Sequence, residues 1–341
     1  MSLQLHAQDT FDAYMKEMNK VIVGYGHIKE RVFESLVTGA NVLLTSVPGL
    51  SKTTLIETMA AVFTGSRKAI VQFTPDLMPK DLLGFNMFDQ ESRTYKTKHG
   101  KLYGANFFLA DEINRAPATT QAALLRAMQE RKISIEGSEF DLENPFIVLA
   151  TQNPIEQEGT YNLPEAQVDR FQFNLLMGYL SKAEELRIAE LVTRHGRDLI
   201  AAMDVQSVIP LSDILTLGKD IREQIDVPPT VYEYAVDLAR ATRRGEQEFS
   251  AYLSEHEKDV SLGGSPRAYN HLVAVGKVVA ALKARTYVTH DDIKSVAHDV
   301  LRHRIGLTPQ AIHHKVTTDS LIDKLLERVP VVSSPAMVAV H

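Results

Sequence analysis

The sequence of 341 residues contains no cysteine. Without cysteine there is no disulfide framework, no thiolate metal site and no cysteine nucleophile. The first twenty residues lack the apolar core of a secretory signal, and no apolar stretch reaches the roughly 20 residues that a membrane-spanning helix needs. These absences predict a cytoplasmic protein with no membrane insertion.

An excess of positive charge is also missing. The net charge is −6 and the isoelectric point is near 6.1, with lysine and arginine scattered along the chain. No basic stripe marks a phosphate backbone as the main ligand, so nucleic acid is disfavoured as a partner. The hydrophobic share of 44% is enough to bury one sizeable core and a second, smaller one.

Short apolar runs alternate with helical patterns in the first half of the chain. The runs occupy residues 41–45, 68–73, 106–110, 146–151 and 171–177. They lack clean polar alternation, which is typical of parallel strands buried on both faces, although short runs alone cannot be distinguished from core helix. Because turn residues flank them, the sequence predicts an α/β fold with a parallel five-stranded sheet.

The strand signal disappears after about residue 180, and helix caps take its place. Ser181 with Glu184 predicts a helix that stops at Gly196. Further helix starts are expected at Pro228–Pro229, at Ser265–Pro266, and at Thr289 with Asp292. We therefore expect an α/β domain over residues 1–180, a helical domain over 181–331, and a loose tail over 332–341.

Two details of the helical domain are also expected. The helix that starts at Pro228–Pro229 is predicted to end at Gly245, and its buried face is predicted to comprise Val231, Tyr232, Ala235, Leu238 and Ala239. Residues 245–264 are polar and bounded by glycines, so they are predicted to form a surface connection.

Residues 41–60 have the order strand, loop, helix that a phosphate-binding loop requires. Backbone N–H groups would surround the phosphates, Lys52 would neutralise their oxygens, and Thr53 would bind magnesium. The candidate nucleotide-contacting residues here are Val47, Pro48, Gly49, Leu50, Ser51, Lys52, Thr53 and Thr54.

This loop departs from the pattern GxxxxGK[ST], because Ser46 and Ser51 stand at its two glycine positions. A left-handed backbone at Ser46 would cost about 1–2 kcal/mol, and the side chain of Ser51 would narrow the space beside the phosphates. An ordinary turn before an amphipathic helix is an alternative for this segment alone.

The third apolar run ends in Asp111 and Glu112. Two carboxylates at the end of a core strand are costly unless they face a cation. Asp111 would hold magnesium, and Glu112 would orient and deprotonate an attacking water. A solvated strand end is the alternative for this pair alone.

Three further side chains suit phosphoryl transfer. Asn153 follows the fourth run and would bond both the γ-phosphate and the attacking water. Arg170 precedes the fifth run and Arg267 opens a helix of the second domain, and guanidinium groups match phosphate oxygens. Each has an ordinary alternative, a turn for Asn153 and a surface salt bridge for either arginine. Their joint occurrence in one order favours the functional interpretation.

These segments together resemble the MoxR group of AAA+ ATPases over roughly residues 10–331. The resemblance is carried by VGYGHIKE, LLTSVPGLSKT, QFTPDLMPKDLLG, FFLADEINRAPATTQAALLRAMQE, ATQNPIEQEGTYNLPEAQVDRF, SPRA and YVTHDDIKSVAHDVLRHR. It implies an AAA+ nucleotide-binding domain followed by a helical lid domain.

The resemblance also implies a role for each candidate residue. Val23 and Gly24 match the adenine-contacting segment, Lys52 and Thr53 the end of Walker A, Asp111 and Glu112 Walker B, Asn153 sensor 1, Arg267 sensor 2, and Arg170 the arginine finger that reaches a neighbouring subunit. Arg115 and Arg131 are alternative interface arginines. The implied ligands are ATP and Mg²⁺.

Assembly and partners follow from the same resemblance. It implies a homo-oligomer, expected to be a hexameric ring, and a separate client protein with a von Willebrand factor A domain. It also implies an insertion between Leu82 and Tyr103 and a hairpin around Ile133 to Phe140. Their tips are expected near His99–Gly100 and Gly137–Ser138, facing the ring centre or the partner.

Three functions are compatible with these patterns. The first is an ATPase whose hydrolysis cycle remodels a protein client. The second is a nucleotide-gated scaffold that scarcely hydrolyses ATP, with Ser46 and Ser51 marking a weakened site. The third, a nucleic-acid motor, has no support from charge. The complete set of Asp111, Glu112, Asn153 and the two arginines favours the first.

Overall fold

The structure, a computed structural model, describes residues 2–47, 49–153, 161, 163–196 and 198–331. The chain divides into two compact units, one formed by residues 9–171 and 175–216, the other by residues 1–8, 172–174 and 217–341. The expected boundary after residue 180 differs from this division, because the two helices that follow it belong to the sheet-containing unit. The expected tail lies outside the described residues.

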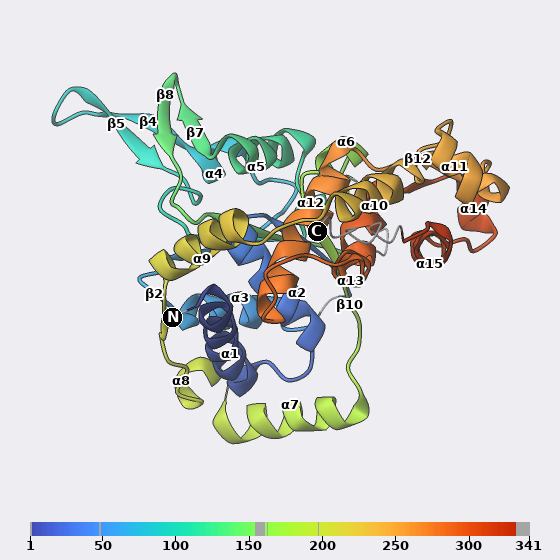
Figure 1. Ribbon diagram of the computed structural model, residues 1–341. Coiled ribbons are helices and arrows are strands. Elements are labelled where there is room, and N and C mark those ends of the chain that lie inside the picture. The colour runs from blue at the N-terminus through green and yellow to red at the C-terminus, as the bar shows by residue number, and fades with distance from the viewer. Residues whose placement is uncertain (1, 48, 154–160, 162, 197, 332–341) are drawn as a thin grey trace. The chain divides into compact units, whose positions relative to one another are not determined.

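A five-stranded sheet forms the centre of the first unit, although residues 173–174 of one strand are counted in the other unit (Figure 1). Its strands are β1 (Val42–Ser46), β3 (Lys68–Gln72), β6 (Phe107–Asp111), β9 (Ile147–Gln152) and β10 (Phe173–Met177), in the order β10-β1-β9-β6-β3. The pairs β1–β9, β9–β6 and β6–β3 are all parallel. The five predicted strands are confirmed, with small shifts at their ends.

This topology determines where polar side chains gather. The strands β1, β6 and β9 are buried along almost their whole length, and each has one half-buried residue near its carboxyl end. Because the strands are parallel, their carboxyl ends meet at one edge of the sheet, which is where ligands bind in open α/β sheets. Thr45 lies opposite Gln152 in the β1–β9 register, and Gln72 lies opposite Asp111 in the β3–β6 register.

A hydrophobic core holds this arrangement in place. It joins Phe73, Phe108 and Phe146 to Leu124 and Leu125 of helix α5 (Ala118–Glu130). The other elements of this unit are α1 (Leu3–Val21), α2 (Gly26–Thr38), α3 (Lys52–Val62), β2 (Phe63–Thr64), α4 (Pro79–Leu83), η1 (Ile113–Arg115), α6 (Glu165–Val168), α7 (Lys182–His195), α8 (Leu199–Ala202), β11 (Ile209–Pro210) and the first half of α9 (Leu211–Gln224), with the first residues of α1 counted in the other unit. The helix α7 begins with the expected capping box of Ser181 and Glu184.

Two antiparallel hairpins extend from this unit beside α4 and α5 (Figure 1). The first pairs β4 (Gly84–Asp89) with β5 (Thr94–His99), so its tip lies at residues 90–93. The expected tip at His99–Gly100 is therefore wrong. His99 pairs with Gly84, and the N–H of Gly100 donates to the carbonyl of Leu83 (3.2 Å), so these residues form the base.

The second hairpin matches its prediction. It pairs β7 (Lys132–Ile135) with β8 (Ser138–Asp141). Glu136 and Gly137 form the turn, both with positive φ angles. The expected tip at Gly137–Ser138 lies at this turn, while its orientation in an assembly stays a prediction.

The second unit is mainly helical. It contains α10 (Pro229–Arg240), α11 (Gln247–Tyr252), η2 (Ser254–His256), β12 (Val260–Leu262), α12 (Pro266–Leu282), α13 (His290–Leu301), η3 (Arg302–Arg304), β13 (Gly306–Leu307), α14 (Pro309–His313) and α15 (Thr318–Arg328). The helix starts predicted at Pro228–Pro229, Ser265–Pro266 and Thr289 are confirmed. Within the described residues, no helix is both long enough and apolar enough to cross a membrane.

Two details of the helical unit were predicted wrongly. Residues 245–264 are not a bare surface connection, because α11 and β12 form there and bury Phe249 and Val260. Helix α10 ends at Arg240 rather than at Gly245. Its buried face includes Tyr234, whereas Tyr232 is 48% exposed, because residues 231, 234, 235 and 238 share one face of the helix.

Candidate nucleotide-binding site

The predicted phosphate loop connects buried strand β1 to helix α3. Lys52 is the first residue of α3, and the N-cap residue Ser51 makes no side-chain hydrogen bond to the helix. The first N–H groups of α3 are therefore not capped by a side chain, and such groups bind anions together with the helix dipole. Val47, Gly49, Leu50 and Thr53 lie in this segment, and Pro48 lies outside the described residues.

The two serines of the loop have different conformations. Ser46 ends β1 in extended conformation, so the expectation of a left-handed backbone at Ser46 is wrong. The left-handed serine is Ser51, with φ 54°. Within the described residues the Oγ of Ser46 is buried and has no hydrogen-bond partner, whereas Ser51 is exposed. The backbone strain of this loop therefore lies beside Lys52.

The carboxyl ends of β6 and β9 contact each other through Thr151. The Oγ1 of Thr151 donates to Asp111 Oδ1 (2.6 Å) and accepts from the N–H of Glu112 (2.8 Å). Lys52 is 8% exposed, and its Nζ lies 3.7 Å from the same Oδ1. The structure thus brings Lys52 and Asp111 together, as the sequence predicted.

Glu112 adopts a left-handed backbone, with φ 53°. A glutamate in this region costs about 1–2 kcal/mol, and such strain is concentrated at functional sites. Its Oε2 accepts from Gln72 Nε2 (2.9 Å) and from Arg115 Nη1 (2.7 Å). The carboxylate of Glu112 is therefore held in one orientation by residues of β3 and η1.

Asn153 directly follows β9 and is half-buried. The preceding residue, Gln152, donates from Nε2 to Thr45 Oγ1 (2.9 Å), which ties the end of β9 to the end of β1. The backbone thus places Asn153 on the edge of the sheet that also carries Asp111. Its role in catalysis stays a prediction.

A cavity of about 180 Å³ adjoins the loop at Ser51. It is lined mainly by apolar residues, which are Val21, Ile22, Val23, Tyr25, Ser51, Thr54, Leu55, Met177, Ile188, Val192 and Leu199. Three of the predicted nucleotide contacts, Val23, Ser51 and Thr54, therefore share one cavity. Its apolar walls suit a flat aromatic base, and α7 and α8 supply Ile188, Val192 and Leu199.

The predicted adenine-contacting segment is tightly held. Gly24 has φ 68°, and a Cβ built there would lie 2.6 Å from Leu180 Cδ2 and 2.8 Å from Glu184 Oε1. Lys29 Nζ donates to the carbonyl of Ile22 (3.0 Å), and burial lowers the pKa of Lys29 to about 8. Only glycine fits at position 24 without displacing its neighbours.

The arginines predicted to complete the site differ in their surroundings. The guanidinium of Arg131 is bound within its own chain, because it donates to the carbonyls of Phe146 and Gly39, and burial lowers its pKa. Arg115 bonds Glu112. Arg170 follows α6 and makes no ion pair within the described residues, and Arg267 belongs to the helical unit. The roles of Arg170 and Arg267 stay predictions.

The residues present fit a magnesium–triphosphate group. Asp111 Oδ1 is occupied by Thr151 and Lys52, while its Oδ2 has no hydrogen bond within the described residues. That oxygen and the hydroxyl of the exposed Thr53 are the hard ligands that Mg²⁺ prefers. Lys52 and the N–H groups of α3 supply complementary charge for phosphate oxygens.

Gln72 and Thr151 were missed by sequence reasoning. Both lie at the carboxyl ends of strands adjacent to Asp111, on β3 and β9. The strand assignment already placed them on the same edge, so a search for polar residues at all strand ends would have found them.

Two protein-family models match parts of the chain. The family described as "ATPase family associated with various cellular activities (AAA)" matches residues 41–173, and the family described as "AAA lid domain" matches residues 253–325. Chaperone MoxR1 of Mycobacterium tuberculosis is 39% identical over 320 residues, which cover 94% of this chain and 82% of that protein.

Two further proteins are similar over nearly the whole chain. Protein MoxR of Methylorubrum extorquens is 29% identical over 329 residues, covering 95% of each chain. The crystal structure of a candidate ATPase from Cytophaga hutchinsonii superposes with a TM-score of 0.88, at 36% identity and 97% coverage of both chains.

Proposed function

The chain belongs to the MoxR family of AAA+ ATPases, and from this premise we propose that it hydrolyses Mg-ATP to remodel or activate a protein client. The reaction transfers the γ-phosphoryl group of ATP to water. The proposal names the residues that bind the nucleotide, orient the water and complete the site.

One observation carries the proposal, the continuous set of contacts at the carboxyl ends of β3, β6 and β9. Lys52 lies beside Asp111, Thr151 joins Asp111 to the backbone of Glu112, and Gln72 and Arg115 hold the carboxylate of Glu112. Phosphoryl transfer depends on positioning and electrostatic stabilisation, so a preorganised set of this kind suits it.

Each residue of the set has one role in the proposed reaction. Lys52 and the N–H groups of α3 bind the β- and γ-phosphates, and Thr53 with Asp111 holds magnesium. Magnesium, when bound, neutralises charge that develops on the phosphate oxygens. Glu112 orients the attacking water and accepts its proton, and Asn153 donates to the γ-phosphate or to that water.

Two arginines complete the proposal. Arg267, from the helical unit, contacts the γ-phosphate as sensor 2. Arg170 reaches the nucleotide of a neighbouring subunit, which requires a ring, and a hexamer is the size expected from the resemblance. In this view the two hairpins contact a client with a von Willebrand factor A domain.

Phosphate release at saturating Mg-ATP tests hydrolysis. We expect steady turnover by the purified chain and none when magnesium is chelated. A nucleotide-gated scaffold would bind ATP, measured by calorimetry, and release no phosphate above the rate of buffer alone, and that result would reject the ATPase.

Affinity capture tests the client. A Glu112→Gln chain should retain ATP and hold a client that the wild-type chain releases on hydrolysis. Capture of a protein with a von Willebrand factor A domain, dependent on ATP and lost in Lys52→Ala, supports the client assignment. Capture that is the same with and without ATP contradicts it.

A further inference from the structure

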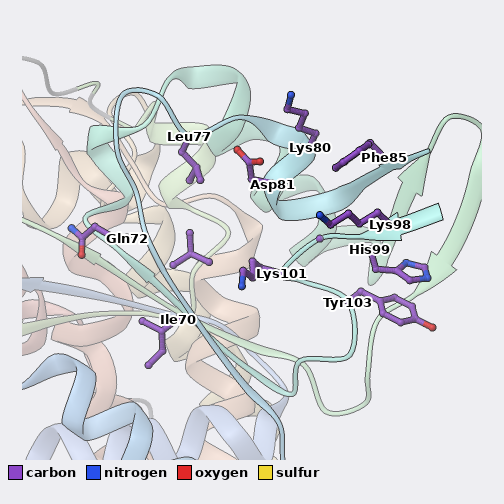
Figure 2. Close-up of a pocket in the computed structure, with 12 residues that line it drawn as sticks. Ile70, Gln72, Leu77, Lys80, Asp81, Phe85, Lys98, His99, Lys101 and Tyr103 are labelled. Atoms are coloured by element: carbon purple, nitrogen blue, oxygen red, sulfur yellow. The ribbon is translucent and has the colours of Figure 1, made fainter. Parts of the chain in front are cut away.

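A second and larger cavity lies at the open edge of the sheet, next to the base of the β4–β5 hairpin. Its volume is about 750 Å³, within the range of ligand-binding clefts. It is lined by β3, by α4 and by the strand and loop that end the hairpin, through Ile70, Val71, Gln72, Leu77, Lys80, Asp81, Phe85, Lys98, His99, Gly100, Lys101 and Tyr103. Figure 2 shows Lys101 between β3 and the hairpin.

One wall of the cavity is strongly basic. Lys80, Lys98 and Lys101 are all exposed, and none of them makes an ion pair within the part of the chain that the structure describes. The one carboxylate in the lining, Asp81, already accepts from the N–H of Met78 (2.9 Å). Charge complementarity therefore favours an acidic occupant.

The opposite wall is an open strand edge. Among the residues that the structure describes, β3 is the last strand of the sheet and pairs with β6 on one side only. The carbonyl of Arg67 accepts from Phe107 N–H, and the N–H of Phe73 donates to the carbonyl of Asp111. Since strand backbones alternate, residues 67, 69, 71 and 73 face β6, and the N–H and C=O groups of Ile70 face outwards.

Stacked aromatic rings lie at the base of the hairpin, next to the lysines. The rings of His99 and Tyr103 stack at 3.7 Å, and Phe140 of β8 lies edge-on to His99 at 4.9 Å. The N–H groups of Lys101 and Leu102 donate to the carbonyls of Asp81 and Leu82. A Cβ at Gly100 would lie 2.3 Å from the carbonyl oxygen of Leu82, so only glycine fits at this close approach of the two backbones.

We propose that this cavity binds an acidic polypeptide segment in extended conformation, which adds a strand to the outer edge of β3. The backbone of the segment would exchange hydrogen bonds with Ile70, its carboxylates would pair with Lys98 and Lys101, and its apolar side chains would contact the stacked rings. A small anion would form ion pairs with the lysines but would not form backbone hydrogen bonds with β3. Strand addition uses main-chain bonds for affinity and side-chain pockets for specificity.

The test uses the full chain without nucleotide, so its outcome does not depend on hydrolysis. The probe is a fluorescein-labelled ten-residue peptide of alternating glutamate and valine, and its binding is followed by anisotropy. We expect saturable binding that weakens as salt is added, and no binding of the matching lysine–valine peptide.

Variants of this chain separate the two walls of the cavity. Lys98→Glu with Lys101→Glu should weaken binding of the peptide by about tenfold or more, since two attractive charges become repulsive. Ile70→Pro removes the outward N–H, which β6 does not use, and should weaken binding by about fivefold. Ile70→Thr changes the same side chain but keeps the N–H, so Ile70→Pro should bind more weakly than Ile70→Thr. Lys182→Glu, which alters an exposed lysine on α7, should bind like the wild type.

Three results would overturn the proposal. The first is equal binding by all variants. The second is displacement of the peptide by inorganic tripolyphosphate together with unchanged binding by Ile70→Pro, which would identify a small-anion site. The third is a wild-type chain that binds no peptide but self-associates in sedimentation, with the self-association abolished in the lysine double variant. In that case a second copy of the chain would cover the outer edge of β3. Circular dichroism of Ile70→Pro checks that the sheet is intact.

Discussion

Charged side chains have different surroundings at two edges of the same sheet, the edge formed by the carboxyl ends of the strands and the outer side of β3. At the carboxyl edge, Lys52, Asp111 and Glu112 are each held by a neighbouring side chain, and Thr151 and Gln72 complete the contacts. At the outer edge beside β3, Lys80, Lys98 and Lys101 make no ion pair within the described residues. The first edge is organised before any ligand arrives, and the second presents unpaired charge to solvent.

The difference follows from what each edge is proposed to do. Chemistry on a phosphoryl group gains from groups whose orientation is fixed in advance, because no reorganisation is needed during the reaction. Recognition of a polypeptide gains from charges that have no partner until the ligand binds.

The largest expected effect is a loss of ATP turnover on substitution of Arg170, which is proposed to act on the nucleotide of a neighbouring subunit. Arg170→Ala should bind ATP normally but lose about 10³-fold or more in turnover, because an arginine supplied in trans stabilises charge in the transition state. Mixing this variant with Lys52→Ala, which keeps Arg170, should restore part of the activity measured by phosphate release. A mixture that exchanges labelled subunits yet stays inactive would point to Arg115 instead.

Removal of a positive charge at the carboxyl ends of the strands should weaken ATP binding more than removal of a positive charge elsewhere on the surface. Lys52→Ala should weaken ATP binding about 100-fold, because the triphosphate loses its cationic partner in the loop. Calorimetry measures this, with Lys68→Ala as the control, since Lys68 pairs with Glu57 on the surface. Equal affinities of the two variants would contradict the phosphate-loop assignment.

Much of this organisation was predictable from sequence, because strong local signals determine it. The buried runs gave the sheet, and Ser181 with Glu184 gave the start of α7. Lys52 and Asp111 were placed together because both follow strands of one parallel sheet. These predictions depend on periodicity and on chain direction, which a sequence contains.

The features that could not be predicted depend on strand pairing and on contacts between segments that are distant in sequence. The tip of the β4–β5 hairpin was misplaced because register is set by which residues pair, and Gly84 pairs with His99. The left-handed serine was assigned to Ser46 because a motif gives positions and no φ angles. Arg131 was an alternative interface arginine, and its carbonyl partners within the chain could not be predicted because they are distant in sequence.

Ser51 allows a test of the backbone strain beside Lys52, with a smaller expected effect. Ser51→Gly should raise the free energy of unfolding of the sheet-containing unit by about 1 kcal/mol, because glycine adopts a left-handed backbone without steric cost. Ser51→Ala keeps the strain and is the matched control. Urea unfolding followed by circular dichroism measures the difference, and no gain of Ser51→Gly over Ser51→Ala would place the strain elsewhere.

The smallest effect is expected on ATP affinity when the lysines beside the outer strand β3 are changed. Lys98→Glu with Lys101→Glu should leave ATP affinity within about twofold, because exposed charges are largely screened by salt. Calorimetry at physiological ionic strength measures it. A tenfold loss would show that the two edges share one ligand and would remove the distinction between them.

The central claim is that Glu112 activates water for hydrolysis of ATP held by Lys52 and Asp111. Pre-mixing Glu112→Gln with labelled ATP, followed by single-turnover quenching, measures binding and cleavage in one experiment. We predict bound, intact ATP and a cleavage rate lower by about 10²–10⁴-fold than in the wild type, the usual contribution of a general base. Glu91→Gln, an exposed glutamate at the tip of the β4–β5 hairpin, should cleave at the wild-type rate. Cleavage by Glu112→Gln at the rate of Glu91→Gln would contradict the account.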